Sequence, residues 1–343
     1  MRSARSALAC PSCWGLEATY ARAMLSDTAL RFAALSATLT ATLALAACGD
    51  DTSSSGQGGA GASGTGGATS SGATTSSSSG AGGDTGAGGS SGVGGEGGGA
   101  PAGSAGCGPA SADAPGQWVE KTIDVDGTSR TYFVRLPSGY DAATPYPVVY
   151  QFHGCSSSAT KENNNVPLDA LAGSSAILVR GRAVGDCWDT AAAGPDVAFF
   201  DALVAALEST SCADPTRRFV AGYSSGAFMT HRLACVRGDQ IRGVASIAGG
   251  MGGNGCSGEV AALLIHDEND ATVNISASQQ ARDAHLARNG CEATSQAADP
   301  APCARYDGCD AGLPVVWCQT QGQGHARQDA LASGAFWGFF SSL

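Results

Sequence analysis

A Gly-x-Ser-x-Gly pentapeptide between a predicted strand and a predicted helix constrains the fold of this chain more than any other feature. The apolar run 219–221 is short and is predicted to be a buried strand, and residues 227–235 are predicted to form a helix. The pentapeptide between them is Gly222-Tyr223-Ser224-Ser225-Gly226. A serine at its centre sits on a sharp turn, so small residues must flank it to let the strand and the helix approach each other. The sequence therefore predicts an exposed, nucleophilic Ser224 with a helix N-terminus beside it.

Composition divides the chain into an N-terminal part that cannot form a core and a C-terminal part that can. Residues 49–106 are almost entirely Gly, Ser, Ala and Thr, which bury too little apolar surface to offset the entropy of ordering. We expect residues 48–106 to form a flexible linker and residues 107–343 to form one large domain. The net charge of −11 and the pI near 4.8 argue against a nucleic-acid partner.

An export signal is expected before the linker. Residues 1–47 include a short apolar run that ends in small residues, which is typical of a secretory signal rather than a spanning helix. Met24 is an alternative start that gives this signal an ordinary length. Leu45-Ala46-Ala47-Cys48 resembles the bacterial lipobox, which implies cleavage before Cys48 and lipidation of its thiol. We therefore expect an exported protein that is anchored to the outer surface of a bacterial membrane by this lipid or is secreted.

The cysteine count agrees with export. Three of the 13 cysteines lie before the linker or at its start, at positions 10, 13 and 48, which leaves ten in the domain. An even count in an exported domain predicts disulfides. Cys10 and Cys13 form a C-x-x-C, but no second pair lies in range, so we do not expect a zinc site there.

Predicted strands and helices alternate through the domain. This alternation predicts an α/β fold with a mostly parallel central sheet and helices on both faces. Ligands bind such sheets outside the carboxyl ends of the strands, where the segments after 152, 222, 265 and 319 all lie. Asp196 is expected to be an N-cap. The predicted strands are 118–125, 130–136, 145–152, 176–179, 219–221, 241–247, 260–265, 304–306 and 315–317, and the predicted helices are 198–207, 227–235, 276–288 and 329–340.

A nucleophilic serine needs a base to accept its proton and an acid to orient that base. His325 lies in a Gly-flanked loop after the last predicted strand, where an imidazole can reach Ser224. Asp270 is the favoured acid because it lies in the loop after strand 260–265, and Asp267 is the alternative. The other histidines are less suited: His153 precedes the serine, His231 should point away, His266 ends a strand and His285 is expected to be exposed on its helix.

Donors for the developing oxyanion are expected from two backbone positions. His153-Gly154-Cys155 follows a predicted strand and resembles the hydrolase loop that supplies the first donor. We expect that donor to be the Cys155 N–H and the second to be the N–H of Ser225.

Five segments together resemble one group of secreted α/β-hydrolases, the polyhydroxybutyrate depolymerases and feruloyl esterases. The resemblance covers residues 107–343 and implies the α/β-hydrolase fold in a single catalytic domain, with Ser224 as nucleophile, Asp270 as acid and His325 as base. The segments, which have the order and spacing of that group, are His153-Gly154-Cys155, Cys187-Trp188-Asp189, Gly222-Tyr223-Ser224-Ser225-Gly226, His266-Asp267-Glu268-Asn269-Asp270 and Gly322-Gln323-Gly324-His325.

The resemblance implies a serine carboxylic-ester hydrolase that works through an acyl-enzyme, without a metal or a cofactor. Trp188 and Tyr223 are expected to bind the substrate, which is a plant cell-wall feruloyl ester, a polyester of hydroxyalkanoates or acetylated xylan. We expect a monomer. Two interpretations compete: a non-catalytic surface lipoprotein on the same fold, which the presence of both Ser224 and His325 disfavours, and a peptidase, which the absence of a lid-sized insertion disfavours.

Disulfide pairs are predicted from the strand or helix end that each cysteine occupies. Cys155 and Cys187 both follow strands, so both should lie at the active-site edge. Cys212 precedes the serine-bearing strand and Cys235 ends the returning helix, so these two should meet at the opposite edge. The remaining expected pairs are Cys303 with Cys318 across a predicted hairpin, Cys291 with Cys309, and Cys107 with Cys256.

Overall fold

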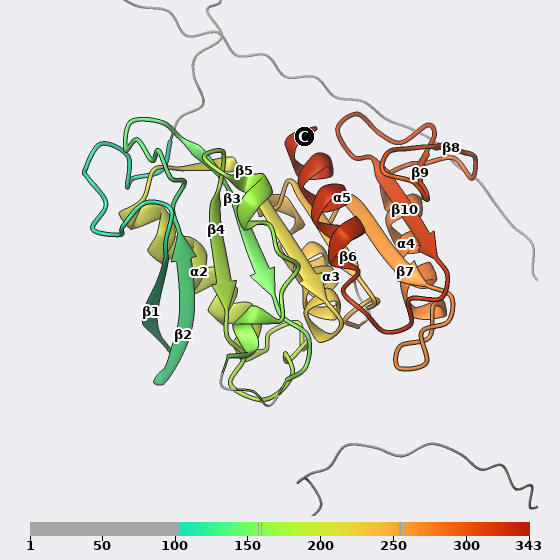
Figure 1. Cartoon of the computed structure of the whole chain (residues 1–343), viewed down its shortest axis with the longest axis horizontal. Coiled ribbons are helices and arrows are strands. Elements are labelled where there is room, and N and C mark those ends of the chain that lie inside the picture. Colours follow the sequence, from blue (N-terminus) through green and yellow to red (C-terminus); the bar gives the residue numbers. More distant parts are fainter. Residues whose placement is uncertain (1–102, 157, 159, 254–255, 257) are drawn as a thin grey trace, which may run out of the picture. The chain divides into compact units, whose positions relative to one another are not determined.

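A β-sheet through the centre of the domain positions everything else (Figure 1). The computed structural model describes residues 103–343 apart from 157, 159, 254–255 and 257. Within these residues the sheet has ten strands in the order β1-β2-β4-β3-β5-β6-β7-β10-β9-β8. The strands are β1 (Trp118–Val125), β2 (Thr128–Arg135), β3 (Tyr146–Phe152), β4 (Ile177–Gly181), β5 (Ala213–Tyr223), β6 (Gly243–Ile247), β7 (Ala261–Asp267), β8 (Ser295–Ala297), β9 (Cys303–Tyr306) and β10 (Val315–Thr320).

The central strands are parallel and the flanking strands are antiparallel. β4, β3, β5, β6, β7 and β10 run in one direction, as each neighbouring pair shows. The β1–β2 hairpin adds to one edge of this core and β9 and β8 add to the other, all antiparallel. The expected α/β-hydrolase fold with a mostly parallel sheet is therefore confirmed.

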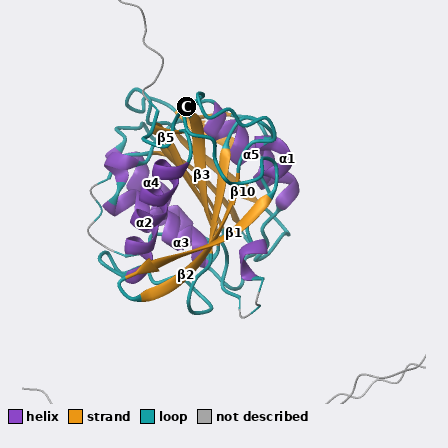
Figure 2. Cartoon of the chain, turned by 90° about the vertical axis from the view of Figure 1, so that its left-hand side faces the viewer, coloured by secondary structure: helices purple, strands orange, loops and turns teal. Residues whose placement is uncertain are grey.

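Helices cover both faces of the sheet, as Figure 2 shows with the sheet between them. One layer contains α2 (Pro195–Thr210), α3 (Ser225–Val236) and α4 (Ser276–Arg288), and the other contains α1 (Asp169–Ala172) and α5 (Asp329–Ser341). Short 3-10 helices span Lys161–Asn163 and Gly238–Gln240. No helix among the described residues is both long enough and apolar enough to cross a bilayer.

Each central strand buries side chains on both of its faces, which is why the strands are apolar runs rather than alternating patterns. On β3, Tyr150 packs edge-on against Phe200 of α2 with 5.2 Å between ring centroids. The neighbouring Val149 belongs to the other core cluster, with α5. On β5, Phe219 stacks on Phe340 of α5 at 4.7 Å. The sheet therefore separates two hydrophobic cores and is held rigidly between them.

The parallel strands deliver their following loops to one edge of the sheet. β3 ends at Phe152, β5 at Tyr223, β7 at Asp267 and β10 at Thr320. In Figure 1 the arrowheads of β3, β4 and β7 point towards this edge, at the bottom of the view. The candidate segments named from the sequence therefore meet where ligands bind in sheets of this kind.

Two local predictions about α2 and β5 need correction. β5 begins at Ala213, well before the predicted strand, because this stretch pairs with Tyr146 at the start of β3. Asp196 is not the N-cap of α2, since Gly194 holds that position. Asp196 is instead buried and pairs with buried Arg130, with 2.5 Å between Oδ1 and Nη2.

Five disulfides lie in the described region, and three of them join the expected partners. These three are Cys155–Cys187, Cys291–Cys309 and Cys303–Cys318. The expected pairs Cys212–Cys235 and Cys107–Cys256 are wrong, because the structure joins Cys107 to Cys212 and Cys235 to Cys256.

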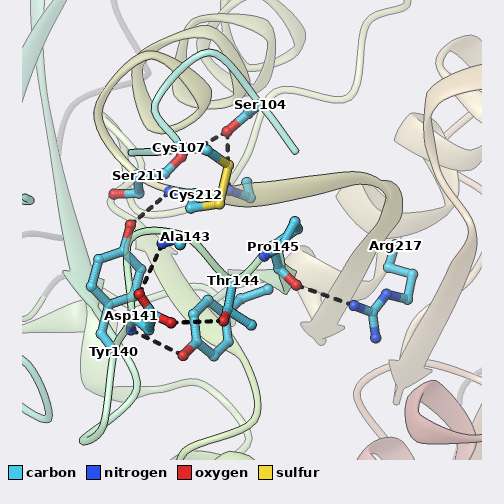
Figure 3. The surroundings of a disulfide bond; sticks show 12 residues. Ser104, Cys107, Tyr140, Asp141, Ala143, Thr144, Pro145, Ser211, Cys212 and Arg217 are labelled. Carbon is cyan, nitrogen blue, oxygen red and sulfur yellow. Dashed lines mark hydrogen bonds between the residues drawn. A yellow bond between two sulfur atoms is a disulfide. The ribbon is translucent and has the colours of Figure 1, made fainter. Parts of the chain in front are cut away.

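The N-terminal segment explains the first wrong pair (Figure 3). The folded domain begins before the expected boundary at 107, since the Ser104 N–H donates to the Ala213 carbonyl at 2.9 Å. Its Ser104 hydroxyl also donates to the Ser211 carbonyl at 2.7 Å. These bonds bring Cys107 directly to Cys212 at the start of β5.

The loop between β6 and β7 explains the second wrong pair. It returns past the end of α3, where the Gly258 N–H donates to the Cys235 carbonyl at 3.2 Å. Cys256 lies in this loop and is therefore placed beside Cys235, to which it is joined. The predictions for residues 1–47, for Cys48 and for most of the linker 48–106 lie outside the described residues, as do Cys10 and Cys13.

Candidate active site

Ser224 lies on a strained turn between β5 and α3. Its φ of 54° and ψ of −118° are rare for a residue with a side chain. Only glycine fits at position 226, because a Cβ there would overlap the carbonyl group of Phe152 at the end of β3. A Cβ at Gly222 would likewise collide with the Gly226 carbonyl. The two glycines thus allow the tight approach that exposes the Ser224 hydroxyl, as the pentapeptide predicts.

Three side chains from three loops form a hydrogen-bonded row at this turn. His325 Nε2 lies 2.9 Å from Ser224 Oγ, and His325 Nδ1 lies 2.7 Å from Asp270 Oδ2. A carboxylate oxygen can only accept, so Nδ1 carries the hydrogen and Nε2 is free to accept the serine proton. The arrangement has the geometry of a nucleophile, a base and an orienting acid.

Asp270 is held as a carboxylate by several donors. Its Oδ1 accepts the N–H groups of Thr272 at 2.8 Å and Val273 at 2.9 Å. Burial alone would raise the pKa of Asp270, but the hydrogen bonds from His325, Val273 and Thr272 outweigh it and lower the pKa below the usual 3.8. Its side chain is fully buried, so the charge faces His325 without screening by water.

Asp267, the alternative acid, holds the loop that carries the histidine. Its carboxylate accepts the N–H groups of Gln323 at 2.9 Å and Gly324 at 3.0 Å. It also accepts the Thr320 hydroxyl at 2.9 Å. Asp267 thus fixes the turn just before His325, while Asp270 contacts the imidazole itself.

The Cys155 and Ser225 N–H groups are both available to an oxyanion. Within the described part of the chain, neither group donates to a protein acceptor. Cys155 is joined to Cys187, which ties the loop after β3 to the loop after β4. The Trp188 N–H donates to Ser225 Oγ at 2.9 Å and so links this second loop to the start of α3.

His153 stabilises the loop that carries Cys155 through three hydrogen bonds. Its Nδ1 lies 2.6 Å from the Gly154 carbonyl and its Nε2 accepts the Ala183 N–H at 3.1 Å. These partners require a neutral ring with the hydrogen on Nδ1. Burial agrees, since it lowers the pKa of His153 to about 4. The His153 carbonyl accepts the Trp188 indole N–H at 2.8 Å, which locks the loop further.

A cavity of about 520 Å³ opens beside the Ser224 hydroxyl. The two residues expected to bind substrate both line it, but each is more than nine-tenths buried and has a structural contact as well. Trp188 bonds to His153, and the Tyr223 hydroxyl donates to the His325 carbonyl at 3.1 Å. Sequence reasoning missed the other side chains of the lining, because loop residues of these types carry no motif: Asn164, Thr190, Phe228, Thr272 and Val273.

The remaining histidines lie away from the serine, and one differs from expectation. His285 is fully buried rather than exposed, because its Nε2 lies 3.1 Å from His231 Nδ1 between α3 and α4. His231 Nε2 in turn lies 2.9 Å from the Ser246 hydroxyl. His266, also fully buried, lies behind Asp270.

Curated relatives share most of this domain. The chain is 33% identical to feruloyl esterase D of Neurospora crassa over 71% of this chain and 91% of that protein. It is 29% identical to feruloyl esterase C of Emericella nidulans over 67% of this chain and 91% of that protein. No family model matches the chain.

Among solved structures, an acetyl xylan esterase from Aspergillus awamori has the same fold. The two structures align with a TM-score of 0.53 and 16% identity, over 64% of this chain and 99% of that one. The extent and identity of the sequence matches decide the assignment: the chain belongs to the feruloyl esterases, which are carboxylic ester hydrolases of the α/β-hydrolase fold.

Proposed function

We propose that this protein is a serine esterase that cleaves feruloyl-type esters through an acyl-enzyme, with Ser224, His325 and Asp270 as its catalytic residues. The observation that carries the proposal is the continuous row from Ser224 Oγ through His325 to Asp270, at 2.9 and 2.7 Å, beside a cavity. Membership of the feruloyl esterases supports the substrate class.

In the first half of the reaction, Ser224 Oγ attacks the ester carbonyl carbon while His325 Nε2 takes the hydroxyl proton. The carbonyl oxygen becomes an oxyanion and accepts hydrogen bonds from the N–H groups of Cys155 and Ser225. Asp270 stabilises the imidazolium that forms. Collapse of the tetrahedral intermediate breaks the bond to the alcohol, which leaves with the proton from His325. The acid part of the substrate is then esterified to Ser224.

The second half uses water in the place of the alcohol. His325 takes a proton from the water as its oxygen attacks the acyl carbon, and the oxyanion forms again at the same two donors. His325 then returns the proton to Ser224 Oγ, and the free acid leaves. The enzyme is regenerated without a cofactor.

The lining of the cavity supports an aromatic acyl group. Among the lining residues, Trp188, Tyr223 and Phe228 are aromatic and Val273 is apolar. Asn164 and Thr190 are polar side chains in the same lining and suit ring substituents that form hydrogen bonds. A flat phenolic acid fits this mixture better than a short aliphatic acid does.

The substrate class is tested with methyl esters, so that the leaving alcohol is constant. We expect kcat/KM for methyl ferulate to exceed that for methyl acetate and methyl 3-hydroxybutyrate by tenfold or more, on the order of what one apolar contact surface gives. Ser224→Ala is the control and should hydrolyse none of them. A preference for the hydroxybutyrate, together with clearance of a polyhydroxybutyrate film, would assign a polyester instead, and a preference for the acetate would assign acetylated xylan.

We further propose that the chain acts as an exported monomer anchored through a lipid on Cys48. The five disulfides support export, because such bonds persist in oxidising compartments. Cys48→Ser should release the protein from the membrane fraction of a bacterial host that processes lipoproteins, since the lipid is the proposed anchor. A variant that remains in the membrane fraction would refute the lipid site.

A further inference from the structure

His266 is a buried histidine next to Asp270 that the proposed reaction does not use. It lies in β7 directly before Asp267, and its side chain has no exposed surface. Its Nε2 lies 2.9 Å from the Val273 carbonyl oxygen and 3.3 Å from Asp270 Oδ2. Its Nδ1 lies 2.6 Å from the Ser278 hydroxyl on α4.

The partners of the ring determine where its hydrogen lies. Both atoms that face Nε2, a carbonyl oxygen and a carboxylate oxygen, can only accept, so Nε2 must carry a hydrogen. Nδ1 faces a hydroxyl group, which can donate to it or accept from it. The single hydrogen of that Ser278 hydroxyl goes either to Nδ1 or to the Gly249 carbonyl oxygen. In either case Nε2 carries a hydrogen, and burial favours the neutral ring by lowering the pKa of His266.

The Nε2–H contacts the short turn that presents the Asp270 carboxylate. The N–H of Val273 donates to Asp270 Oδ1, and the carbonyl of the same residue accepts from His266. The imidazole thus holds Val273 through its carbonyl, while Asp270 holds the same residue through its N–H. It also points a positive N–H dipole at Oδ2, the oxygen that accepts from His325.

We propose that His266 is the positioning residue for Asp270: its Nε2–H anchors the 270–273 turn and faces Oδ2, which holds the carboxylate in line with His325. The inference rests on the proposed function, because it needs Asp270 to be the acid of that reaction. The Ser278 hydroxyl on α4 orients the imidazole of His266 through its contact with Nδ1.

A matched pair of amide variants separates the two ring nitrogens. In His266→Gln the side-chain amide nitrogen can occupy the place of Nε2 and still donate to Val273. In His266→Asn the shorter amide reaches only the place of Nδ1. We expect His266→Asn to lose kcat on methyl ferulate by about tenfold to a hundredfold with KM little changed, as misplacement of a catalytic group does. His266→Gln should recover most of that loss.

The same pair at His231 is the control for burial. This histidine is also fully buried and also faces a serine hydroxyl, but it contacts none of the three proposed catalytic residues. We expect His231→Asn and His231→Gln to have equal kcat. A spectroscopic readout accompanies the kinetics: the His325 Nδ1–H in its bond to Asp270 gives a far-downfield proton resonance, which should persist in His266→Gln and both His231 variants and shift or vanish in His266→Asn.

Equal kcat and unchanged downfield resonances in the two His266 variants would overturn the inference, as would a loss of kcat in the His231 pair of the same size. Ester hydrolysis by Ser224→Ala would instead overturn the proposed function. The downfield resonance does not require turnover, so it still decides whether His266 positions Asp270 in that case.

Discussion

Two carboxylates three residues apart, one at the end of β7 and one in the loop after it, have different tasks. Asp270 contacts the imidazole of His325 directly, at 2.7 Å from Nδ1. Asp267 instead accepts from Gln323 and Gly324, the two residues before that histidine. Asp270 thus determines which nitrogen of His325 carries the hydrogen, and Asp267 determines the conformation of the loop that carries His325.

The two aspartates should therefore fail differently when each becomes asparagine. Asp270→Asn removes the acceptor of the Nδ1 hydrogen and allows the wrong tautomer, so kcat on methyl ferulate should fall by roughly 10³ to 10⁴. Asp267→Asn keeps the tautomer but weakens the loop, so it should lower the Tm and cost far less turnover. Steady-state kinetics and thermal melts of both variants test this; a larger loss of kcat in Asp267→Asn would move the acid to that position.

At this scale the sequence was informative about Ser224 and His325 and less so about their supports. The glycines on either side of Ser224 predict the tight turn that presents it, and the position of His325 in a loop after a strand predicts that it can reach the serine. The choice between Asp267 and Asp270 depends on side-chain direction, which the sequence spacing does not encode. The predicted exposure of His285 is wrong because its partner, His231, lies on a different helix, which the sequence pattern does not reveal.

The loops after β3 and β4 form one unit through a disulfide. Cys155–Cys187 joins them, and Trp188 bonds to the His153 carbonyl and to Ser225. The proposed oxyanion donor, the Cys155 N–H, is thus part of a cross-linked frame and does not depend on one flexible loop. Preorganised donors of this kind cost no rearrangement as charge develops.

Replacing both Cys155 and Cys187 by serine should separate stability from catalysis. The loss of the cross-link should lower the free energy of unfolding by roughly 2–4 kcal/mol. Freeing the donor should also lower kcat by about a hundredfold well below the melting temperature, with little change in KM. Urea melts and kinetics at low temperature measure the two effects, and full turnover in the double variant would contradict the preorganisation argument.

Element order could be predicted from the sequence, whereas some long-range pairings could not. Buried strands between two helical layers are apolar throughout, so β3, β4, β6 and β7 were recognisable. The error in pairing Cys212 with Cys235 arose because both lie at the same sheet edge. That edge is wide, and each cysteine meets a nearer partner on a segment of irregular structure, which has no periodic pattern to place it.

Buried neutral histidines couple the stability of the whole domain to pH. Burial lowers the pKa of His153 to about 4 and that of His231 to about 3, and it lowers the pKa of His285 well below 6.5. In the unfolded chain these groups titrate near 6.5. Between the unfolded and folded values the unfolded state binds more protons, so the free energy of unfolding falls as the pH falls.

We expect this loss to begin near pH 6.5 and to reach about 1.4 kcal/mol per pH unit for each buried histidine near pH 5. Urea denaturation at several pH values between about 7 and 5 measures the slope. In His231→Gln the change in the free energy of unfolding per pH unit should decrease by the contribution of one histidine, whatever the stability of the variant at neutral pH. An unchanged slope would mean that His231 is protonated in the folded state.

The central claim is that Ser224 is the nucleophile of an esterase, and a fluorophosphonate label tests it most directly. The reagent phosphonylates a serine only where a base activates the hydroxyl and donors hold the oxyanion. Peptide mapping of the labelled protein should find the adduct on Ser224, and Ser224→Ala, folded as judged by its melting curve, should take up no label and hydrolyse no methyl ferulate. An adduct on another residue, or turnover by Ser224→Ala, would contradict the account.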